Sequence, residues 1–143
     1  MASPTSISDC MHRNPLTIGE DEALVRAIDL LVEFKLTGLT VLGADGRPCG
    51  KITELDCIRA VLNAIYNEGS PENITVGQAM SADIHACDPD ETIVEVAQRM
   101  IDTRQRRNAV IQDGKLVGQV SSSNILWALM EHSRGRSGSQ PGL

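Results

Sequence analysis

Two heptapeptides decide the fold of this chain: GKITELD at residues 50–56 and GQVSSSN at residues 118–124. Each runs from a glycine through a β-branched residue and a small hydroxyl residue to an Asp or an Asn. One such heptapeptide would carry little information. Because their glycines are 68 residues apart in a chain of 143, the two together predict that the whole chain is a duplication.

The rest of the chain repeats at nearly the same separation. A shift of 69 residues places SISDCM (6–11) on TVGQAM (75–80), and DEALVRAIDLLVEFK (21–35) on DETIVEVAQRMIDTR (90–104). In the longer pair, apolar residues recur at the spacing of an amphipathic helix with one buried face. Both helices are expected to begin with acidic residues, and the pair Asp88-Pro89 is expected to cap the second helix.

A hairpin and a second helix are predicted after each of these helices. Asp-Gly between two apolar runs is a strong hairpin signal. The predicted order in each half is therefore short strand, helix, strand, strand, helix, with the linker NEGSPEN between the halves. A half of about 60 residues is marginal as an independent core, so we expect the two halves to pack on each other. The hairpins are LTVL-GADGR-PCGKIT (39–53) and NAVI-QDGK-LVGQVS (108–121), and the closing helices are expected at 54–66 and 122–133.

This arrangement resembles the cystathionine β-synthase (CBS) domain pair. The resemblance covers residues 6–132 and rests on the VGQAM segment, the GLTVLGADGR hairpin and the recurring heptapeptide. It implies an α/β (α+β) fold in which two β-α-β-β-α repeats pack by pseudo-twofold symmetry into one module. We expect the first repeat, with its N-terminal segment, over 1–70 and the second over 71–134. The polar, Gly/Ser-rich residues 135–143 are expected to form a disordered tail.

The resemblance also implies a function. CBS pairs commonly bind adenosine compounds in the clefts between their repeats, associate as homodimers and act as sensors. We therefore expect a regulatory module that binds AMP, ADP, ATP or S-adenosylmethionine, requires no cofactor and reports energy or metabolite levels to an unknown effector protein. A different class of function is also open, namely a degenerate pair that serves dimerisation or protein interaction without a ligand.

Composition and motifs argue against several other classes of function. The net charge of −6 disfavours nucleic acid as a partner, and no apolar run is long enough to cross a membrane. The N-terminus lacks the features of a signal peptide, and the four cysteines show no CxxC pairing, so a cytoplasmic protein with buried free thiols is expected. The three histidines lack ligand spacing, and no nucleophile elbow, P-loop or G-x-G-x-x-G occurs. Neither an enzyme nor a metal site is expected.

Thr53 and Asp56 in the first heptapeptide are candidates for ribose binding. A carboxylate at a helix N-terminus can accept hydrogen bonds from both ribose hydroxyls, and the Thr53 hydroxyl can serve ribose or phosphate. The structural alternative is that Thr53 caps the helix and Asp56 is a solvated acid in its first turn. The second copy has Asn124 at the carboxylate position. A neutral acceptor lowers the ribose contribution by about 1 kcal/mol, which corresponds to somewhat less than tenfold in affinity.

Arg106 and Arg107 belong to the run RQRR (104–107), whose counterpart in the first half is KLTG (35–38). Planar guanidinium groups suit phosphate oxygens, although a solvated helix end is an equally open interpretation. The resemblance implies one cleft that uses Arg106, Arg107, Ser121 and Asn124, with Thr17, Leu36, Thr37 and Gly38 facing adenine. It implies a second cleft that uses Thr53 and Asp56 near Thr37, with Ala86, Cys87 and Asn108 lining the base. Asn124, and the absence of proline at Thr40 and Ala109 where many members have it, favour the degenerate alternative.

Overall fold

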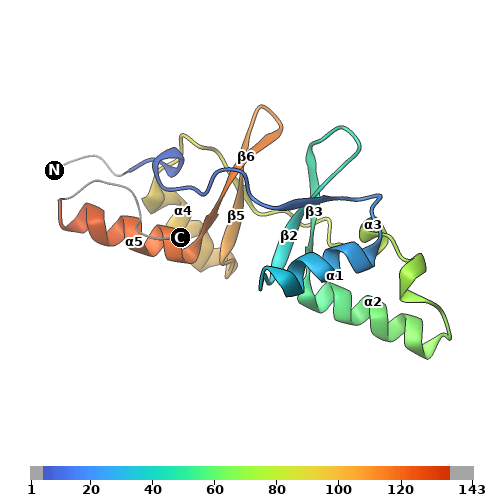
Figure 1. Ribbon diagram of the computed structural model, residues 1–143. Helices are drawn as coiled ribbons and strands as arrows, with labels where there is room; N and C mark the ends of the chain where they lie inside the picture. Colours follow the sequence, from blue (N-terminus) through green and yellow to red (C-terminus); the bar gives the residue numbers. More distant parts are fainter. Residues whose placement is uncertain (1–4, 136–143) are drawn as a thin grey trace. The chain divides into compact units, whose positions relative to one another are not determined.

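The structure, a computed structural model, describes residues 5–135 (Figure 1). The fold is mixed α and β, with two three-stranded sheets and helices, as the sequence predicts. The described residues form two compact units, one of residues 16–84 and the other of residues 5–15 together with 85–135. Apart from Gly135, the predicted tail lies outside the described residues. No helix among residues 5–135 is long and apolar enough to span a membrane.

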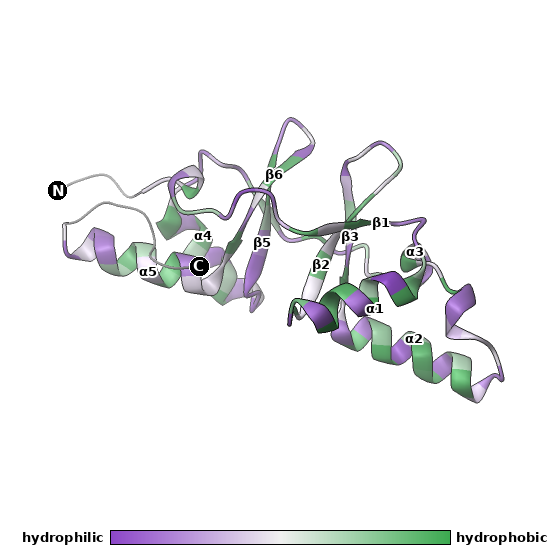
Figure 2. Cartoon of the chain, viewed as in Figure 1, coloured by the Kyte–Doolittle hydropathy of each residue, from purple (hydrophilic) through white to green (hydrophobic). Residues whose placement is uncertain are grey.

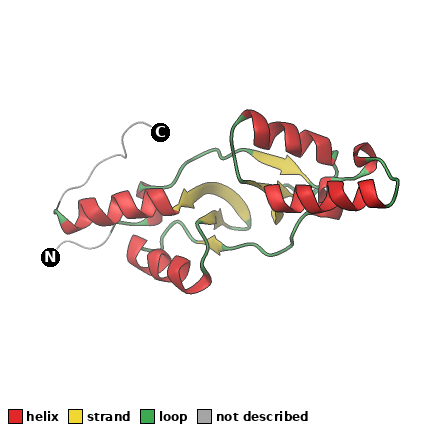
Figure 3. Ribbon diagram, turned by 90° about the horizontal axis from the view of Figure 1, so that it is seen from below, coloured by secondary structure: helices red, strands yellow, loops and turns green. Residues whose placement is uncertain are grey.

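The unit of residues 16–84 is built on a sheet with strand order β1-β2-β3. β1 pairs with β2 in parallel, and β2 pairs with β3 in the antiparallel hairpin that the Asp-Gly signal predicts. α1 and α2 pack against this sheet (Figures 1 and 3). Its elements are β1 (Thr17–Gly19), α1 (Leu24–Glu33), β2 (Gly38–Leu42), β3 (Pro48–Thr53), α2 (Glu54–Tyr66), η2 (Pro71–Asn73) and α3 (Val76–Ala79).

The second unit repeats this design with the strand order β4-β5-β6. β4 and β5 are parallel, and β5 and β6 form the second hairpin around Asp113 and Gly114. The closing helices α2 and α5 span the predicted residues 54–66 and 122–133. The elements of this unit are η1 (Ile7–Asp9), β4 (Ala86–Cys87), α4 (Ile93–Thr103), β5 (Arg107–Gln112), β6 (Lys115–Ser121) and α5 (Ser122–Ser133).

Both cores are aliphatic, because every second residue of the central strands faces the helices. In β2, Leu39 and Val41 are buried between less buried neighbours, and they pack with Ile52 of β3. On α1, apolar residues recur at the predicted helical spacing and bury one face against the strands, while polar residues occupy other positions (Figure 2). The second core is equivalent, and Ile7 from the N-terminal segment is fully buried in it.

The predicted start of the second long helix is wrong. α4 begins at Ile93, and its N-cap is Thr92, whose Oγ1 accepts a hydrogen bond from the Glu95 amide at 3.2 Å. The Asp88 carboxylate instead accepts from the Asp90 amide at 2.9 Å, within a turn. The reason is tertiary, because the turn is held by amides of the N-terminal segment, which donate to its carbonyls. The acidic residues before α1 likewise precede the helix, whose N-cap is Ala23.

The short segment that opens each sequence repeat packs in the unit that contains the other repeat's hairpin. Ser81 exchanges two backbone hydrogen bonds of 2.9 Å with Lys51 of β3. His12 makes the equivalent pair with Gln119 of β6, at 2.7 and 2.9 Å. The compact units therefore exchange the short segments that come first in each sequence repeat. The repeat boundaries at 1–70 and 71–134 remain a prediction about the duplication.

These exchanged segments explain the glycine of each heptapeptide. A Cβ atom on Gly50 would lie 2.5 Å from the Ser81 carbonyl oxygen. A Cβ atom on Gly118 would lie 2.7 Å from the Met11 sulfur and 2.9 Å from the His12 carbonyl oxygen. All three distances are below van der Waals contact, and a backbone carbonyl that is held by a bridge cannot move aside at low cost in energy. Glycine is required here for close approach and not for turn formation.

We predict that Gly50→Ala and Gly118→Ala each lower the free energy of unfolding by about 2–3 kcal/mol, because the added methyl group overpacks the bridge. Urea denaturation followed by circular dichroism measures this change. Gly69→Ala is the matched control, since its Cβ would meet nothing nearer than 3.7 Å. Equal losses of stability in all three variants would contradict the close-approach explanation.

Candidate functional site

In the unit of residues 16–84, four of the predicted ligand residues lie where the hairpin meets α2. Gly38 and Thr53 are opposite each other in the antiparallel register of β2 and β3. The Thr37 carbonyl accepts a hydrogen bond of 3.0 Å from the Glu54 amide at the start of α2. Asp56 lies in the first turn of the same helix. The local fold therefore brings Thr37, Gly38, Thr53 and Asp56 together at one end of the sheet.

Thr53 and Asp56 form a capping box at the N-terminus of α2. Thr53 Oγ1 accepts from the Asp56 amide at 3.1 Å, and Asp56 Oδ2 accepts from the Thr53 amide at 3.0 Å. Thr53 thus caps the helix, as the structural alternative states. Asp56 is only 9% exposed, however, and is not a solvated acid. Since a carboxylate has about four acceptor positions, the box does not exhaust those of Asp56.

Arg59 is a neighbour of this site that the sequence analysis missed. Its Nη1 donates to Asp56 Oδ1 at 3.2 Å, one turn along α2. The signal was present in the sequence, because opposite charges three residues apart on a helix are neighbours on its surface. Arg59 offsets the charge of the buried carboxylate and orients the oxygen that the capping box leaves to other donors.

The second unit builds the equivalent box with neutral groups. The Asn124 amide donates to Ser121 Oγ at 3.1 Å, and Asn124 Oδ1 accepts from the Ser121 amide at 2.9 Å. The Arg106 carbonyl accepts from the Ser122 amide at 2.7 Å, and Arg107 is opposite Ser121 in the register of β5 and β6. The fold therefore brings both arginines, Ser121 and Asn124 to the start of α5. The carboxamide keeps the capping geometry without a charge.

The two arginines are not at a helix end. α4 ends at Thr103, and its C-cap is Arg104, in the left-handed conformation with φ 56°. Arg106 follows in the connecting segment, and Arg107 is the first residue of β5. Both side chains are exposed, and neither forms an ion pair with an acidic residue among those described. The solvated-helix-end interpretation therefore suits Arg104, whereas Arg106 and Arg107 form a separate pair of cations beside the second capping box.

Cys87 and Asn108 lie on the core face of their sheet. Cys87 is opposite Val110, and Asn108 is opposite Val120, and both valines are fully buried in the core. Asn108 is 2% exposed, and its Nδ2 has no hydrogen-bond partner among the described residues. Leu39 holds the equivalent core position in the first repeat.

The other predicted base-lining residues lie elsewhere. Leu36 is partly buried against the core of the first unit, whereas Thr17 and Ala86 belong to the short strands β1 and β4. The roles of these residues toward a base remain predictions.

The cysteines are free thiols, as predicted, but only Cys57 and Cys87 are buried, whereas Cys10 and Cys49 are half-buried. Burial raises the pKa of Cys87 to about 12, and the carboxylate of Glu91 adds to this rise. Burial also raises the pKa of Cys10 to about 11, with Asp9 contributing. Both thiols are therefore protonated at neutral pH, and Cys87 is a neutral residue of the buried core.

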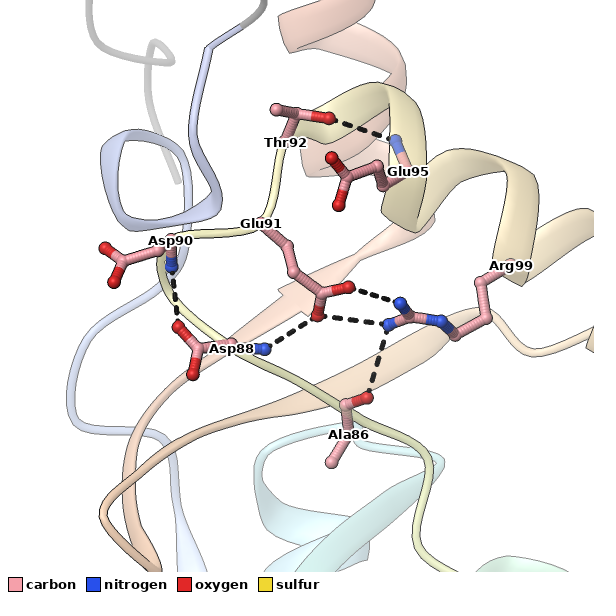
Figure 4. A network of polar contacts seen from close by, with 7 residues as sticks. All are labelled: Ala86, Asp88, Asp90, Glu91, Thr92, Glu95 and Arg99. Carbon is pink, nitrogen blue, oxygen red and sulfur yellow. Dashed lines mark hydrogen bonds and ion pairs between the residues drawn. The ribbon is translucent and has the colours of Figure 1, made fainter.

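An ion pair between Glu91 and Arg99 holds the strand that carries Ala86 and Cys87 (Figure 4). Arg99 contacts both carboxylate oxygens of Glu91, and its Nη1 also lies 3.4 Å from the Ala86 carbonyl oxygen. Glu91 Oε2 accepts from the Asp88 amide at 2.8 Å. The hydrogen bond from Arg99 is the main reason that the pKa of Glu91 lies below its ordinary value. This clamp connects β4, the turn after it and α4.

The first repeat has only half of this clamp. Glu22 Oε2 accepts from the Gly19 amide at 2.9 Å, as Glu91 does from Asp88, but Leu30 stands at the position equivalent to Arg99. The turn is therefore common to both repeats, and the arginine is specific to the second. The sequence alignment of the halves contained this difference, although it did not reveal the contact with Ala86.

We predict that Glu91→Gln lowers the free energy of unfolding at pH 7 by on the order of 1 kcal/mol, since the pair is partly exposed. The pKa of Glu91 is depressed in the folded state. Its contribution is therefore present above the ordinary glutamate pKa and is lost as the pH falls through the folded value. The difference between wild type and variant should shrink on acidification below about pH 4.

Urea denaturation at a series of pH values measures this difference. Glu22→Gln is the matched control, because it removes the charge from the equivalent turn contact, where no arginine pairs with the carboxylate. A difference for Glu91→Gln that stays constant between neutral and acid pH would contradict the ion-pair assignment.

The sequence matches the CBS domain family over residues 7–63 and again over residues 76–131. The chain belongs to the CBS domain family. The two matches correspond to the two sequence repeats, so the predicted tandem CBS pair is confirmed.

Two relatives are similar to this chain over most of its length. Hypoxic response protein 1 of Mycobacterium tuberculosis is 30% identical over 129 residues, which are 90% of this chain and 88% of that protein. The uncharacterized protein MJ1225 of Methanocaldococcus jannaschii is 27% identical over 120 residues, or 84% of this chain. The chain spans only 41% of the length of MJ1225. The CBS pair thus occurs both in proteins of similar length and within longer ones.

Two solved structures share the fold. CBSX2 of Arabidopsis thaliana, solved in complex with AMP, has a TM-score of 0.76 and 23% identity, and covers 90% of this chain and 98% of its own. The CBS pair of protein MJ0100, in complex with 5'-methylthioadenosine and S-adenosyl-L-methionine, has a TM-score of 0.71 and 21% identity over 91% of this chain and 99% of its own. Within residues 5–135 of the present chain, no group of three or more His, Cys, Asp or Glu side chains could hold a metal ion.

Proposed function

We propose that this CBS pair is a non-catalytic regulatory module that binds an adenosine-type nucleotide and acts as an energy or metabolite sensor on another protein. The ligand is AMP, ADP, ATP or S-adenosylmethionine, and the working unit is a cytoplasmic homodimer. The observation that carries the proposal is the pair of exposed arginines beside the second capping box, because the Arg106 carbonyl is hydrogen-bonded to the Ser122 amide at the start of α5.

The polar groups at the start of α5 suit a phosphorylated ligand. Two guanidinium groups without acidic partners among the described residues are available to grip phosphate oxygens in pairs. The N-terminus of α5 adds the positive end of the helix dipole, and its capping residues Ser121 and Asn124 offer neutral polar groups for ribose hydroxyls. A nucleotide could therefore place its phosphate at the arginines and its ribose at the box.

The capping box at the start of α2, which contains Asp56, suits a ribose more than a phosphate. Its carboxylate is buried, oriented by Arg59 and able to accept further hydrogen bonds. Thr37 and Gly38 stand at the positions equivalent to Arg106 and Arg107, so this half lacks the paired cations. The two halves are therefore chemically unequal, and we propose one tight nucleotide site per chain.

The comparisons support the ligand class without naming the ligand of this chain. Two structures of the same fold contain adenosine compounds, AMP in one and 5'-methylthioadenosine with S-adenosyl-L-methionine in the other. The degenerate interaction module remains the second candidate. It is favoured by Asn124 at the carboxylate position and by the burial of Cys87 and Asn108 in the core.

A thermal-shift series with AMP, ADP, ATP and S-adenosylmethionine tests the proposal. A ligand at 100 times its Kd adds about 2.7 kcal/mol of stability, which corresponds to several degrees for a domain of this size. We expect the double variant Arg106→Ala/Arg107→Ala to lose the shift that a phosphorylated ligand causes. Each protein is compared with its own ligand-free Tm, so that a change in stability alone is not mistaken for a loss of binding.

The control for the arginine variant is Arg104→Asn. It removes a cation from the same run, and asparagine tolerates the left-handed backbone at that position. A shift that disappears equally in the control would point to non-specific charge attraction. A folded wild-type protein that shows no shift with any of the four ligands would overturn the nucleotide proposal in favour of the interaction module.

Asn124→Asp should restore a charged ribose acceptor in the second half. We expect its affinity for adenosine to rise by up to about tenfold, and its affinity for AMP to rise less, because the new charge repels the phosphate. Isothermal titration calorimetry with both compounds measures this difference. Asn63→Asp adds the same charge on the exposed surface of α2 and serves as the control. An equal gain for adenosine and AMP would contradict the assignment of Asn124 to ribose.

A further inference from the structure

The two closing helices differ in the charge of their first turns. In α2 the first and third residues, Glu54 and Asp56, are acidic, and Arg59 pairs with Asp56. The residues at the three equivalent positions of α5 are all uncharged, namely Ser122, Asn124 and Trp127. The first turn of α5 contains no acidic side chain, so the helix itself does not offset the positive end of its dipole.

The neighbouring strand adds a cation opposite the N-cap of α5. Arg107 begins β5 and is opposite Ser121, the N-cap, in the antiparallel register of β5 and β6 (Figure 1). Residues opposite each other in such a pair point to the same face of the sheet, with Cβ atoms about 4.5–5.5 Å apart. An arginine side chain spans that separation. In the first unit Gly38 is opposite Thr53, so no side chain faces that N-cap.

The carboxamide of Asn124 is oriented by its own capping box. Its Oδ1 accepts from both the amide and the hydroxyl of Ser121, each at 2.9 Å. The other end of a carboxamide is an N–H donor, whereas the other oxygen of a carboxylate is an acceptor. Where Asp56 repels a phosphate group, Asn124 therefore offers it no negative charge.

These differences change the ribose substituent that each box suits. A carboxylate accepts hydrogen bonds from ribose hydroxyls, and it repels a phosphate in the same place. In dinucleotide-binding folds an acidic residue accordingly binds the free 2′-hydroxyl, whereas a nearby arginine accommodates a 2′-phosphate. Asp56 with Gly38 has the first composition, and Asn124 with Arg107 has the second.

We infer that the site at the start of α5 takes an adenosine nucleotide whose ribose carries a phosphate at its 2′ or 3′ position, with Arg107 as the cation that binds this phosphate. One hydroxyl of such a ribose remains for the neutral groups of the box. The inference rests on the proposed function, since it presupposes that a nucleotide binds here. It goes beyond the four ligands proposed above, none of which has a phosphate on the ribose.

Isothermal titration calorimetry of the full chain with AMP, ADP, adenosine 2′,5′-bisphosphate and adenosine 3′,5′-bisphosphate is the first test. We expect one of the bisphosphates to bind about tenfold more tightly than AMP, because a charge-assisted contact replaces a neutral one. ADP is the matched control ligand, since it has two phosphate groups and none on the ribose. The bisphosphate that binds more tightly identifies the 2′ or the 3′ position.

The outcomes of this titration separate the inference from the proposed function. Bisphosphates that bind no more tightly than ADP would overturn the inference and leave the proposed function intact. A folded chain that binds none of the four compounds would overturn both.

The second test reverses the charge logic with Asn124→Asp. The variant should fold, because Asp56 forms the same capping box in the first unit, and circular dichroism checks this. We expect its affinity for the bisphosphate to fall about tenfold while its affinity for adenosine does not fall. Asn63→Asp is the control, since it adds the same charge on the exposed surface of α2. An unchanged bisphosphate affinity in Asn124→Asp would overturn the inference.

Arg107→Gln tests the assigned cation. We expect this variant to lose the advantage of the bisphosphate over AMP and to keep more of its affinity for AMP. Equal losses for the two compounds would assign Arg107 to the 5′-phosphate and overturn its role at the ribose.

Discussion

The close approach of backbone to backbone at Gly50 and Gly118 is the constraint on which the rest of the structure depends. At each glycine a segment from the start of one sequence repeat bridges to the hairpin strand that precedes a closing helix. The bridge places the last residues of that strand, and so determines where Thr53 and Ser121 turn the chain into α2 and α5. A duplicated chain whose units exchange these segments cannot form either sheet unit from one contiguous repeat.

The remaining positions of the heptapeptide follow from the physics of a helix N-terminus. The hydroxyl residue accepts a hydrogen bond from the amide three residues later, and the Asp or Asn returns a bond to the amide of the hydroxyl residue. A ribose would meet these same polar atoms. Structural and ligand-binding interpretations of the motif therefore do not exclude each other, and this is why the spacing alone could not separate them. One part of the structural interpretation is wrong, because Asp56 is buried and is not a solvated acid.

The regular elements could be predicted because their signals are local. Asp-Gly hairpins and apolar periodicity depend on neighbouring residues, and α2 and α5 follow the sequence pattern. The start of α4 could not be predicted in this way, since amides of Ile7 and Ser8, distant in sequence, bind the Asp88–Glu91 turn and override its Asp-Pro signal. The same limitation hid the contact of Arg99 with Ala86 and the burial of Asn108. Alignment of the repeats identifies equivalent positions, but it does not tell which face of a strand a side chain occupies.

The two repeats differ mainly in the charged residues at equivalent positions. The unit of residues 16–84 has a buried carboxylate at Asp56, whereas the other unit has the neutral Asn124 at the equivalent position. The second unit also carries Arg99, Arg106 and Arg107 where the first has Leu30, Thr37 and Gly38. A carboxylate that remained beside the paired arginines would compete with a phosphate for them, so its replacement by a neutral group and the appearance of the cations are consistent with each other. Under the proposed function, the unequal repeats place the carboxylate and the paired arginines at the N-termini of two different helices, which two identical repeats could not do.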